Sequence, residues 1–275
     1  MLEVIKRQYS ARDLPYHIIV PSLPGYAYSS GPPLDKDMNM NDIPRLMNKL
    51  MVALGFGTSG YLAQGGDIGS GVARRSAVQF PECRGFHLNM NMMTPPDNAA
   101  DLPVTATEEK ARSHRNFVEY GSAYAREDGT RTATIGLALS SSPLALLSWI
   151  GEKYLEWTDA DPSLKTILDS VTLYYLTDTM PRCIYPYRSN FGPGRDPEKS
   201  KPKSEYFNAG SKPMGYSWFP FELVPTPRSW TEQSTENLVS YREHEHGGHF
   251  AALEGPEVLW GDVEEFIGKA WKQSG

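Results

Sequence analysis

The chain of 275 residues has little of what marks several large classes of protein. It has only two cysteines, Cys83 and Cys183, which excludes a fold held together by a disulfide framework. It has no run of about 18 apolar residues, so no transmembrane helix is expected. Its first residues lack the apolar stretch of a signal peptide, which predicts a cytoplasmic location. With 27 basic and 33 acidic residues it lacks the basic excess that a nucleic-acid-binding protein usually shows.

The pattern of the first 95 residues is typical of a parallel α/β sheet. Short β-branched or apolar runs alternate with segments whose apolar residues recur at three- and four-residue spacing. The expected elements, in chain order, are a buried strand at 16–20, a helix at 42–54, a strand at 61–64, a helix at 70–80 and a strand at 85–91. This alternation predicts parallel strands connected by helices.

After residue 95 the pattern becomes helical and then returns to strands. Thr105 and Glu108 form a capping box for a helix at 106–125. The further expected elements are helices at 143–157 and 163–176, strands at 213–219 and 237–242, and a helix at 256–272. We therefore predict one α/β domain with a helical insertion. Its divisions are 1–95 for the first part of the core, 96–205 for a helical cap with a linker loop, and 206–275 for the rest of the core.

The most specific local motif is Gly65-Gly66-Asp67-Ile68-Gly69, between an expected strand and an expected helix. It has the form of a nucleophile elbow, with aspartate in the place of the nucleophile. Small neighbours permit the sharp turn, and the helix dipole favours the carboxylate, which is the nucleophilic form of Asp67. The alternative interpretation is a glycine-rich turn in which Asp67 caps the helix.

Three histidines lie close together in His244-Glu245-His246-Gly247-Gly248-His249. In hydrolases with the chain order nucleophile, acid and histidine, the histidine lies in such a late loop. The glycines beside His249 suit a tight catalytic loop and favour this residue over His244 and His246. The alternative is a metal site, but no second Cys/His cluster accompanies these residues. We therefore do not favour a metal site here.

Glu222 is the candidate acid between the nucleophile and the histidine. It follows the strand expected at 213–219, where a carboxylate can orient a histidine and stabilise its imidazolium form. Its order and context distinguish it from the other acidic residues. The chain has no G-x-S-x-G motif, which argues against a serine esterase. The G-x-G-x-x-G match at 55–60 follows a helix and precedes a strand, so it does not indicate a dinucleotide site.

Together these segments resemble the α/β-hydrolase epoxide hydrolases of the microsomal type, above all the fungal members. The resemblance rests on Asp67 in GGDIGS, Glu222 in FPFEL and His249 in GGHFAALEGPE, and it covers nearly the whole chain. It implies an α/β-hydrolase fold with a helical cap. It also implies a catalytic triad of these three residues.

The same resemblance implies two tyrosines that donate hydrogen bonds to the epoxide oxygen. Tyr124 in GSAYA and Tyr187 in PRCIYPYR match them by position, with Tyr185 as an alternative to Tyr187. In the implied mechanism Asp67 attacks an epoxide carbon and forms an alkyl-enzyme ester. His249 then activates the water that releases a vicinal diol. The implied partners are a small apolar epoxide and water, and the implied mechanism needs no metal or organic cofactor.

The chain departs from the family in one respect. It contains no His-Gly-Trp-Pro segment, whose backbone N–H groups complete the oxyanion hole with the N–H of Ile68. Met1 aligns just beyond that segment, so we expect the N-terminal strands of the family to be missing, one of them from between 16–20 and 61–64. The unpaired sheet edge would favour self-association. Ester hydrolysis would be slow because part of the oxyanion hole is lost.

Two other functions remain open at this point. A catalytically degenerate homologue would bind an apolar small molecule or form part of a larger assembly. A haloalkane dehalogenase would also use an aspartate, but it binds halide through donors such as tryptophan. The pair of tyrosines favours the epoxide hydrolase.

Overall fold

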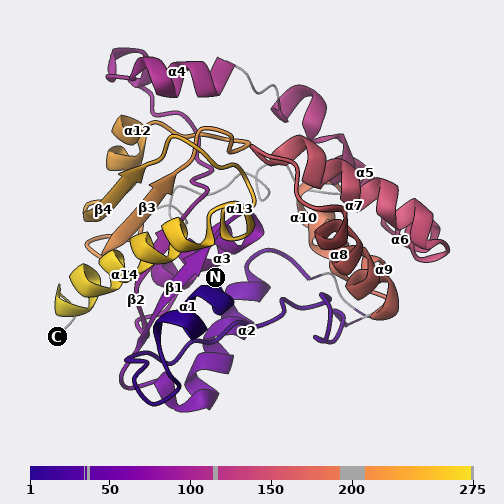
Figure 1. The fold of residues 1–275 in the computed structure, drawn as a ribbon, viewed down its shortest axis with the longest axis horizontal. Helices are drawn as coiled ribbons and strands as arrows, with labels where there is room; N and C mark the ends of the chain where they lie inside the picture. Colours follow the sequence, from indigo (N-terminus) through magenta and orange to yellow (C-terminus); the bar gives the residue numbers. More distant parts are fainter. Residues whose placement is uncertain (34, 36–37, 114–116, 193–207, 274–275) are drawn as a thin grey trace.

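The computed structural model describes residues 1–33, 35, 38–113, 117–192 and 208–273. Within these ranges the chain forms a four-stranded parallel sheet in the order β1-β2-β3-β4. The strands are β1 (Tyr61–Gly65), β2 (Cys83–Leu88), β3 (Met214–Trp218) and β4 (Leu238–Glu243). Figure 1 shows the sheet on one side of the molecule and a group of helices on the other. The parallel α/β sheet is confirmed.

Helices α3 (Ile68–Gln79) and α14 (Pro256–Gln273) cover opposite faces of this sheet. Phe86 of β2 packs in a cluster with alanines of α3. The next residue of the strand, His87, contacts the ring of Phe266 in α14 at 5.6 Å between centroids. Because successive side chains of a strand point to opposite faces, the two helices lie on different sides of the sheet.

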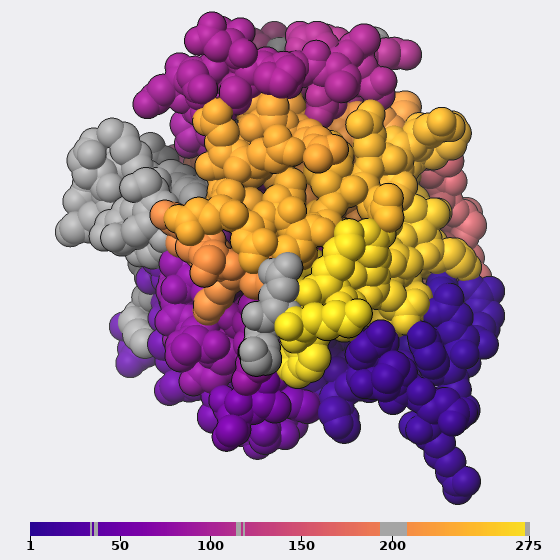
Figure 2. Space-filling view, turned by 90° about the vertical axis from the view of Figure 1, so that its left-hand side faces the viewer, coloured from indigo at the N-terminus to yellow at the C-terminus, as the bar shows by residue number. Residues whose placement is uncertain are grey.

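The N-terminal helix α1 (Leu2–Gln8) packs beside α14, far along the chain. Val4 and Ile5 share a buried apolar cluster with Leu259 and Trp260. The indole Nε1 of Trp260 donates a hydrogen bond of 2.7 Å to the side chain of Gln8. Figure 2 shows the N-terminal residues in indigo beside α14 in yellow. Burial of these apolar side chains joins the two ends of the chain.

The strand predicted at 16–20 is wrong. The structure assigns no strand to these residues, and Val20 is 67% exposed. Tyr16 and Ile18 instead pack at the edge of the cluster around Trp260. A strand needs hydrogen-bonded neighbours, and the resemblance puts another strand between 16–20 and β1. No strand lies there in the described part of the chain, so the run of residues has nothing to pair with.

The helix predicted at 42–54 is present as α2 (Asp42–Met51), which continues into the π-helix η1 (Val52–Phe56). Gly55 ends the regular winding with φ of +96°, the left-handed conformation expected of a glycine at a helix end. The helix predicted at 70–80 is α3. The predicted helix at 256–272 is α14.

The single helix predicted at 106–125 is wrong, although its capping box is right. Thr105 and Glu108 bond reciprocally, at 2.8 Å and 3.1 Å. In the described residues the helical winding is interrupted at Ser122, next to Gly121, and both residues have low helix propensity. The helices of this region are α4 (Ala106–Ser113), the π-helix η3 (Phe117–Gly121), α5 (Ala123–Thr130) and α6 (Thr132–Ser140), after the 3₁₀ turn η2 (Ala99–Asp101).

The next two predicted helices are confirmed as α7 (Pro143–Trp157) and α8 (Leu164–Leu176). Three short elements follow them: α9 (Met180–Cys183), η4 (Tyr185–Tyr187) and α10 (Arg188–Phe191). Helices α6 to α9 share a buried apolar cluster of their own, centred on residues such as Leu146 and Ile167. Two further short helices, α12 (Arg228–Gln233) and α13 (Ala251–Glu254), lie beside the sheet.

An early segment also packs against these helices. Arg182 of α9 donates hydrogen bonds to the carbonyls of Ala27 and Ser29, at 3.2 Å and 2.9 Å. Gly25 has φ of +86°, and a Cβ there would lie 2.5 Å from the carbonyl oxygen of Arg182. The divisions at residues 95 and 205 stay predictions, and most of the linker loop predicted before residue 205 lies outside the described residues.

Among the described residues, no single helix is both long enough and apolar enough to span a membrane. The pair α6 and α7 has the length and composition when taken together, but its two parts meet at 112°.

Candidate active site

Asp67 occupies a sharp turn between β1 and α3. Its backbone has φ of +47°, a left-handed conformation that is strained for any residue but glycine. The turn is possible because its neighbours are glycines. A Cβ on Gly65 would lie 2.0 Å from the carbonyl oxygen of Gly69. The motif therefore folds as a strained strand–turn–helix connection that holds the Asp67 carboxylate at the start of α3.

The structure brings Asp67, His249 and Glu222 together from three distant parts of the chain. His249 Nε2 lies 3.0 Å from Asp67 Oδ2, and His249 Nδ1 lies 2.6 Å from Glu222 Oε1. The side chain of Glu222 is fully buried and that of His249 is 2% exposed, whereas that of Asp67 is 46% exposed. One buried carboxylate thus orients the ring, and the other carboxylate stays partly exposed.

The two carboxylates determine the charge of the histidine. Burial disfavours the imidazolium, but the negative charges and hydrogen bonds of Glu222 and Asp67 outweigh it and raise the pKa of His249 to about 10. Desolvation also disfavours the Asp67 carboxylate. The hydrogen bond and charge of His249, with the backbone N–H of Ile68, overcome this effect and lower the pKa of Asp67. At neutral pH the site therefore holds an ionised Asp67 beside an imidazolium.

Backbone contacts fix the loop that carries His249. The N–H of Phe221 donates to the carbonyl of Gly247 at 3.1 Å, next to Glu222. The N–H of His249 donates to the carbonyl of Trp157, the last residue of α7, at 3.0 Å. The Trp157 ring also meets the His249 ring edge-on at 5.2 Å. No sequence pattern indicated that Trp157 would hold the His249 loop in place.

Tyr124 and Tyr187 lie together on the helical side. Their ring centroids are 6.0 Å apart, and the rings meet edge to face at 71°. Burial raises the pKa of both phenols, and the negative charge of Asp67 raises them further. Both tyrosines therefore keep their protons at neutral pH. The pairing with Tyr124 favours Tyr187 over Tyr185.

The other two histidines of the late segment have partners of their own. His244 Nε2 lies 2.7 Å from Asp262 of α14, whose carboxylate also accepts a hydrogen bond from Ser217. The side chain of His246 is 88% exposed. The three histidines thus face different groups. In the part of the chain that the structure describes, no group of three His, Cys, Asp or Glu side chains is arranged to hold a metal ion.

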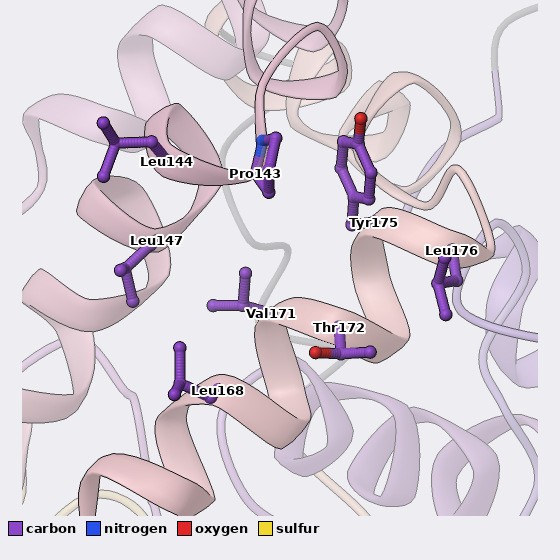
Figure 3. A pocket seen from close by; sticks show the side chains of 8 residues that line it. All are labelled: Pro143, Leu144, Leu147, Leu168, Val171, Thr172, Tyr175 and Leu176. Carbon is purple, nitrogen blue, oxygen red and sulfur yellow. The ribbon is translucent and has the colours of Figure 1, made fainter.

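A separate apolar hollow of about 310 Å³ lies between α7 and α8 (Figure 3). Its lining includes Leu144, Leu147 and Val171. It includes no residue of the triad and neither Tyr124 nor Tyr187. The hollow is therefore distinct from the candidate active site.

Comparisons with known proteins agree with this architecture. A sequence model of the alpha/beta hydrolase fold matches residues 7–131. The solved structure of the Aspergillus niger epoxide hydrolase has a TM-score of 0.88 and 45% identity, covering 98% of this chain and 68% of that chain. A protein of Dothistroma septosporum whose name refers to epoxide hydrolase is 48% identical over 274 residues, covering 98% of this chain and 62% of the relative. Epoxide hydrolase 1 of Oryctolagus cuniculus is 29% identical over 286 residues, with 94% and 61% covered.

The parallel sheet, its helices and these matches define an α/β hydrolase. The identity to the Aspergillus niger structure extends over two thirds of that protein. The chain therefore belongs to the epoxide hydrolase family of this fold, which confirms the predicted fold class and family. It spans 62% of the length of the Dothistroma septosporum relative.

Proposed function

We propose that this chain converts an apolar epoxide to a vicinal diol through an ester on Asp67. The observation that carries the proposal is the His249 ring, held at 3.0 Å from Asp67 and 2.6 Å from Glu222. The tyrosine pair and the membership of the epoxide hydrolase family support it. Aromatic rings around the site, among them Trp157 and Phe250, favour an apolar substrate.

In the first step the ionised Asp67 attacks a carbon of the epoxide ring. A C–O bond forms to the carboxylate oxygen, and the ring C–O bond breaks with its electron pair moving to the epoxide oxygen. Tyr124 and Tyr187 keep their protons at neutral pH, so they can donate hydrogen bonds to this oxygen as it becomes an alkoxide.

In the second step His249 acts as a general base. While Asp67 is ionised, the pKa of His249 is about 10, so the ring carries a proton and cannot accept another. Ester formation removes the negative charge of Asp67 and the hydrogen bond that its carboxylate accepts from His249. Both changes lower the pKa of His249. The neutral form of the ring, which can deprotonate water, is then more populated at physiological pH. The base is thus released only after the ester has formed.

Ester hydrolysis also needs donors for the oxyanion that water creates. The backbone N–H of Ile68, which helps to lower the pKa of the Asp67 carboxylate, is one such donor. The 275 residues contain no His-Gly-Trp-Pro segment to supply further donors. Because one missing donor typically costs about 10²–10³ in rate, we expect a polypeptide of these residues alone to form the ester faster than it hydrolyses it.

A parallel assay with styrene oxide and chlorobutane tests the reaction class. We expect diol from the epoxide and no halide from the haloalkane. Asp67→Asn abolishes diol formation, whereas the control Asp97→Asn, which changes an exposed carboxylate in a loop, leaves it unchanged. Halide release would support a dehalogenase. Neither product nor ester would support a degenerate small-molecule binder, and diol from Asp67→Asn at the parent rate would contradict the role of Asp67.

A further inference from the structure

Lys153 lies inside the helical side of the site, enclosed by three aromatic rings. Its Nζ is 4.9 Å from the centroid of Trp149, 5.0 Å from that of Tyr124 and 5.9 Å from that of Trp157. Its side chain is only 13% exposed. Trp149 and Trp157 are one turn before and one turn after it on α7, so the three side chains share a face of that helix.

This position puts a positive charge against a ring that the proposed mechanism uses. A cation over the face of an aromatic ring is attracted to the negative charge of that face. When Tyr124 donates to a forming alkoxide, its proton moves toward the substrate and its ring gains negative charge. The attraction of Lys153 to the ring is therefore greater in the transition state than before it, and only such a difference accelerates the step.

The ion pair of Lys153 with Glu152 does not cancel this effect. The Glu152 side chain is 55% exposed, so water screens its charge, whereas the ammonium faces the aromatic rings on its other side. A second carboxyl group, Asp128, lies on α5 one turn from Tyr124 and is 2% exposed. Burial raises the pKa of Asp128 to about 7 and the charge of Lys153 opposes that rise, so the ammonium acts on this side of the site.

We propose that Lys153 is a positioning residue that accelerates epoxide opening through Tyr124. The inference rests on the proposed function and extends it to a residue that neither the sequence pattern nor the triad identifies. It also assigns the helical side an electrostatic role in the first step. The second step, in which His249 activates water, does not involve this charge.

The protons and electrons balance in this step. The Asp67 carboxylate forms the new C–O bond, and the electron pair of the broken C–O bond stays on the epoxide oxygen. That oxygen takes the phenolic proton of Tyr124, and the resulting phenolate lies beside the Lys153 ammonium. His249 loses one proton and Tyr124 regains one, through solvent, before water attacks the ester. The net charge of the site is the same after both transfers.

A double-mutant cycle tests the proposal. Lys153→Met and Tyr124→Phe are made singly and together, and ester formation and ester decay are followed by intact mass with styrene oxide under single-turnover conditions. We expect Lys153→Met to slow ester formation at least about tenfold in the parent and by less than about twofold in the Tyr124→Phe background. Ester decay should change by less than about twofold, because it depends on His249.

Two further variants separate this role from a structural one. Lys153→Arg keeps the charge, so it should restore ester formation to within about threefold of the parent. Glu152→Gln breaks the ion pair but leaves the ammonium, so it should stay within about twofold of the parent. If Glu152→Gln is as slow as Lys153→Met, the ion pair carries the effect and the proposal is wrong. Circular dichroism confirms that each variant is folded.

The failure of this proposal differs from the failure of the proposed function. If the parent forms no ester, the assignment of Asp67 fails. If the parent forms the ester and Lys153→Met forms it at the same rate, only the role of Lys153 fails. An equal slowing by Lys153→Met with and without Tyr124 also overturns it, because the effect then does not pass through that ring.

Discussion

The sheet side and the helical side of the candidate site hold their residues by different kinds of contact. On the sheet side, short hydrogen bonds join Asp67, His249 and Glu222. On the helical side, Tyr124 packs against the ring of Tyr187 and lies under the Lys153 ammonium. The sheet side holds an ion pair at the end of rigid strands. The helical side holds neutral hydroxyls whose protons are hard to remove.

The difference suggests that the two sides contribute to different parts of the reaction. In the proposed mechanism the charges on the sheet side perform the covalent steps, which are shared by any enzyme that forms an ester on an aspartate. In the same proposal the donors on the helical side determine which leaving group is accepted, because an epoxide oxygen needs a hydrogen-bond donor when its bond breaks. Trp157 connects the two sides, since its ring packs on Tyr124 and on His249.

We expect the largest effect when both phenolic hydroxyls of the helical side are removed. We expect Tyr124→Phe with Tyr187→Phe to slow ester formation from styrene oxide by about 10³-fold or more, because one such donor alone is typically worth about 10². Single-turnover intact mass measures it. Tyr185→Phe is the matched control, two residues from Tyr187, and should stay near the parent rate. A double variant within about tenfold of the parent would show that the helical side does not assist ring opening.

We expect a smaller effect on the sheet side, in the pKa of His249. In Asp67→Asn the negative charge beside His249 is removed, so we expect the pKa of His249 to fall from about 10 by at least about one unit. The pH titration of the histidine ring signals by NMR measures the shift. An unchanged pKa would mean that Glu222 alone determines the charge of the His249 ring. Ester formation would then not make His249 a better base.

The titration of His249 also makes the free energy of unfolding depend on pH. Because the pKa of folded His249 lies above the ordinary value of 6.5, the imidazolium stabilises the fold fully below pH 6.5. This contribution is lost as the pH rises from there through about 10. The free energy of unfolding of the parent should fall over that interval, by at most about 5 kcal/mol, and should fall less in Asp67→Asn.

Local sequence was enough to find the parts of the site that depend on local geometry. The glycines around Asp67 indicated a tight elbow, and the structure shows the close approach of Gly65 and Gly69 that requires them. The Gly-Gly before His249 indicated a tight loop. Glu222 was found only by chain order and context, because a single carboxylate has no pattern of its own.

Features that depend on distant partners could not be predicted in this way. The β-branched run at 16–20 has the composition of a strand, but in the described structure it has no neighbouring strand to pair with. Tyr124 and Tyr187 were assigned by resemblance alone. Lys153 gave no signal, because a lysine on a helix is usually solvated, and only the folded chain shows the rings that enclose it.

The most direct test of the central claim is the intact mass of the chain after brief exposure to an excess of styrene oxide, with Asp67→Asn treated alongside. We predict a gain equal to one epoxide in the parent, located at Asp67 by peptide mapping, and no gain in the variant. A gain of the same size in Asp67→Asn would contradict the account, as would an adduct on another residue.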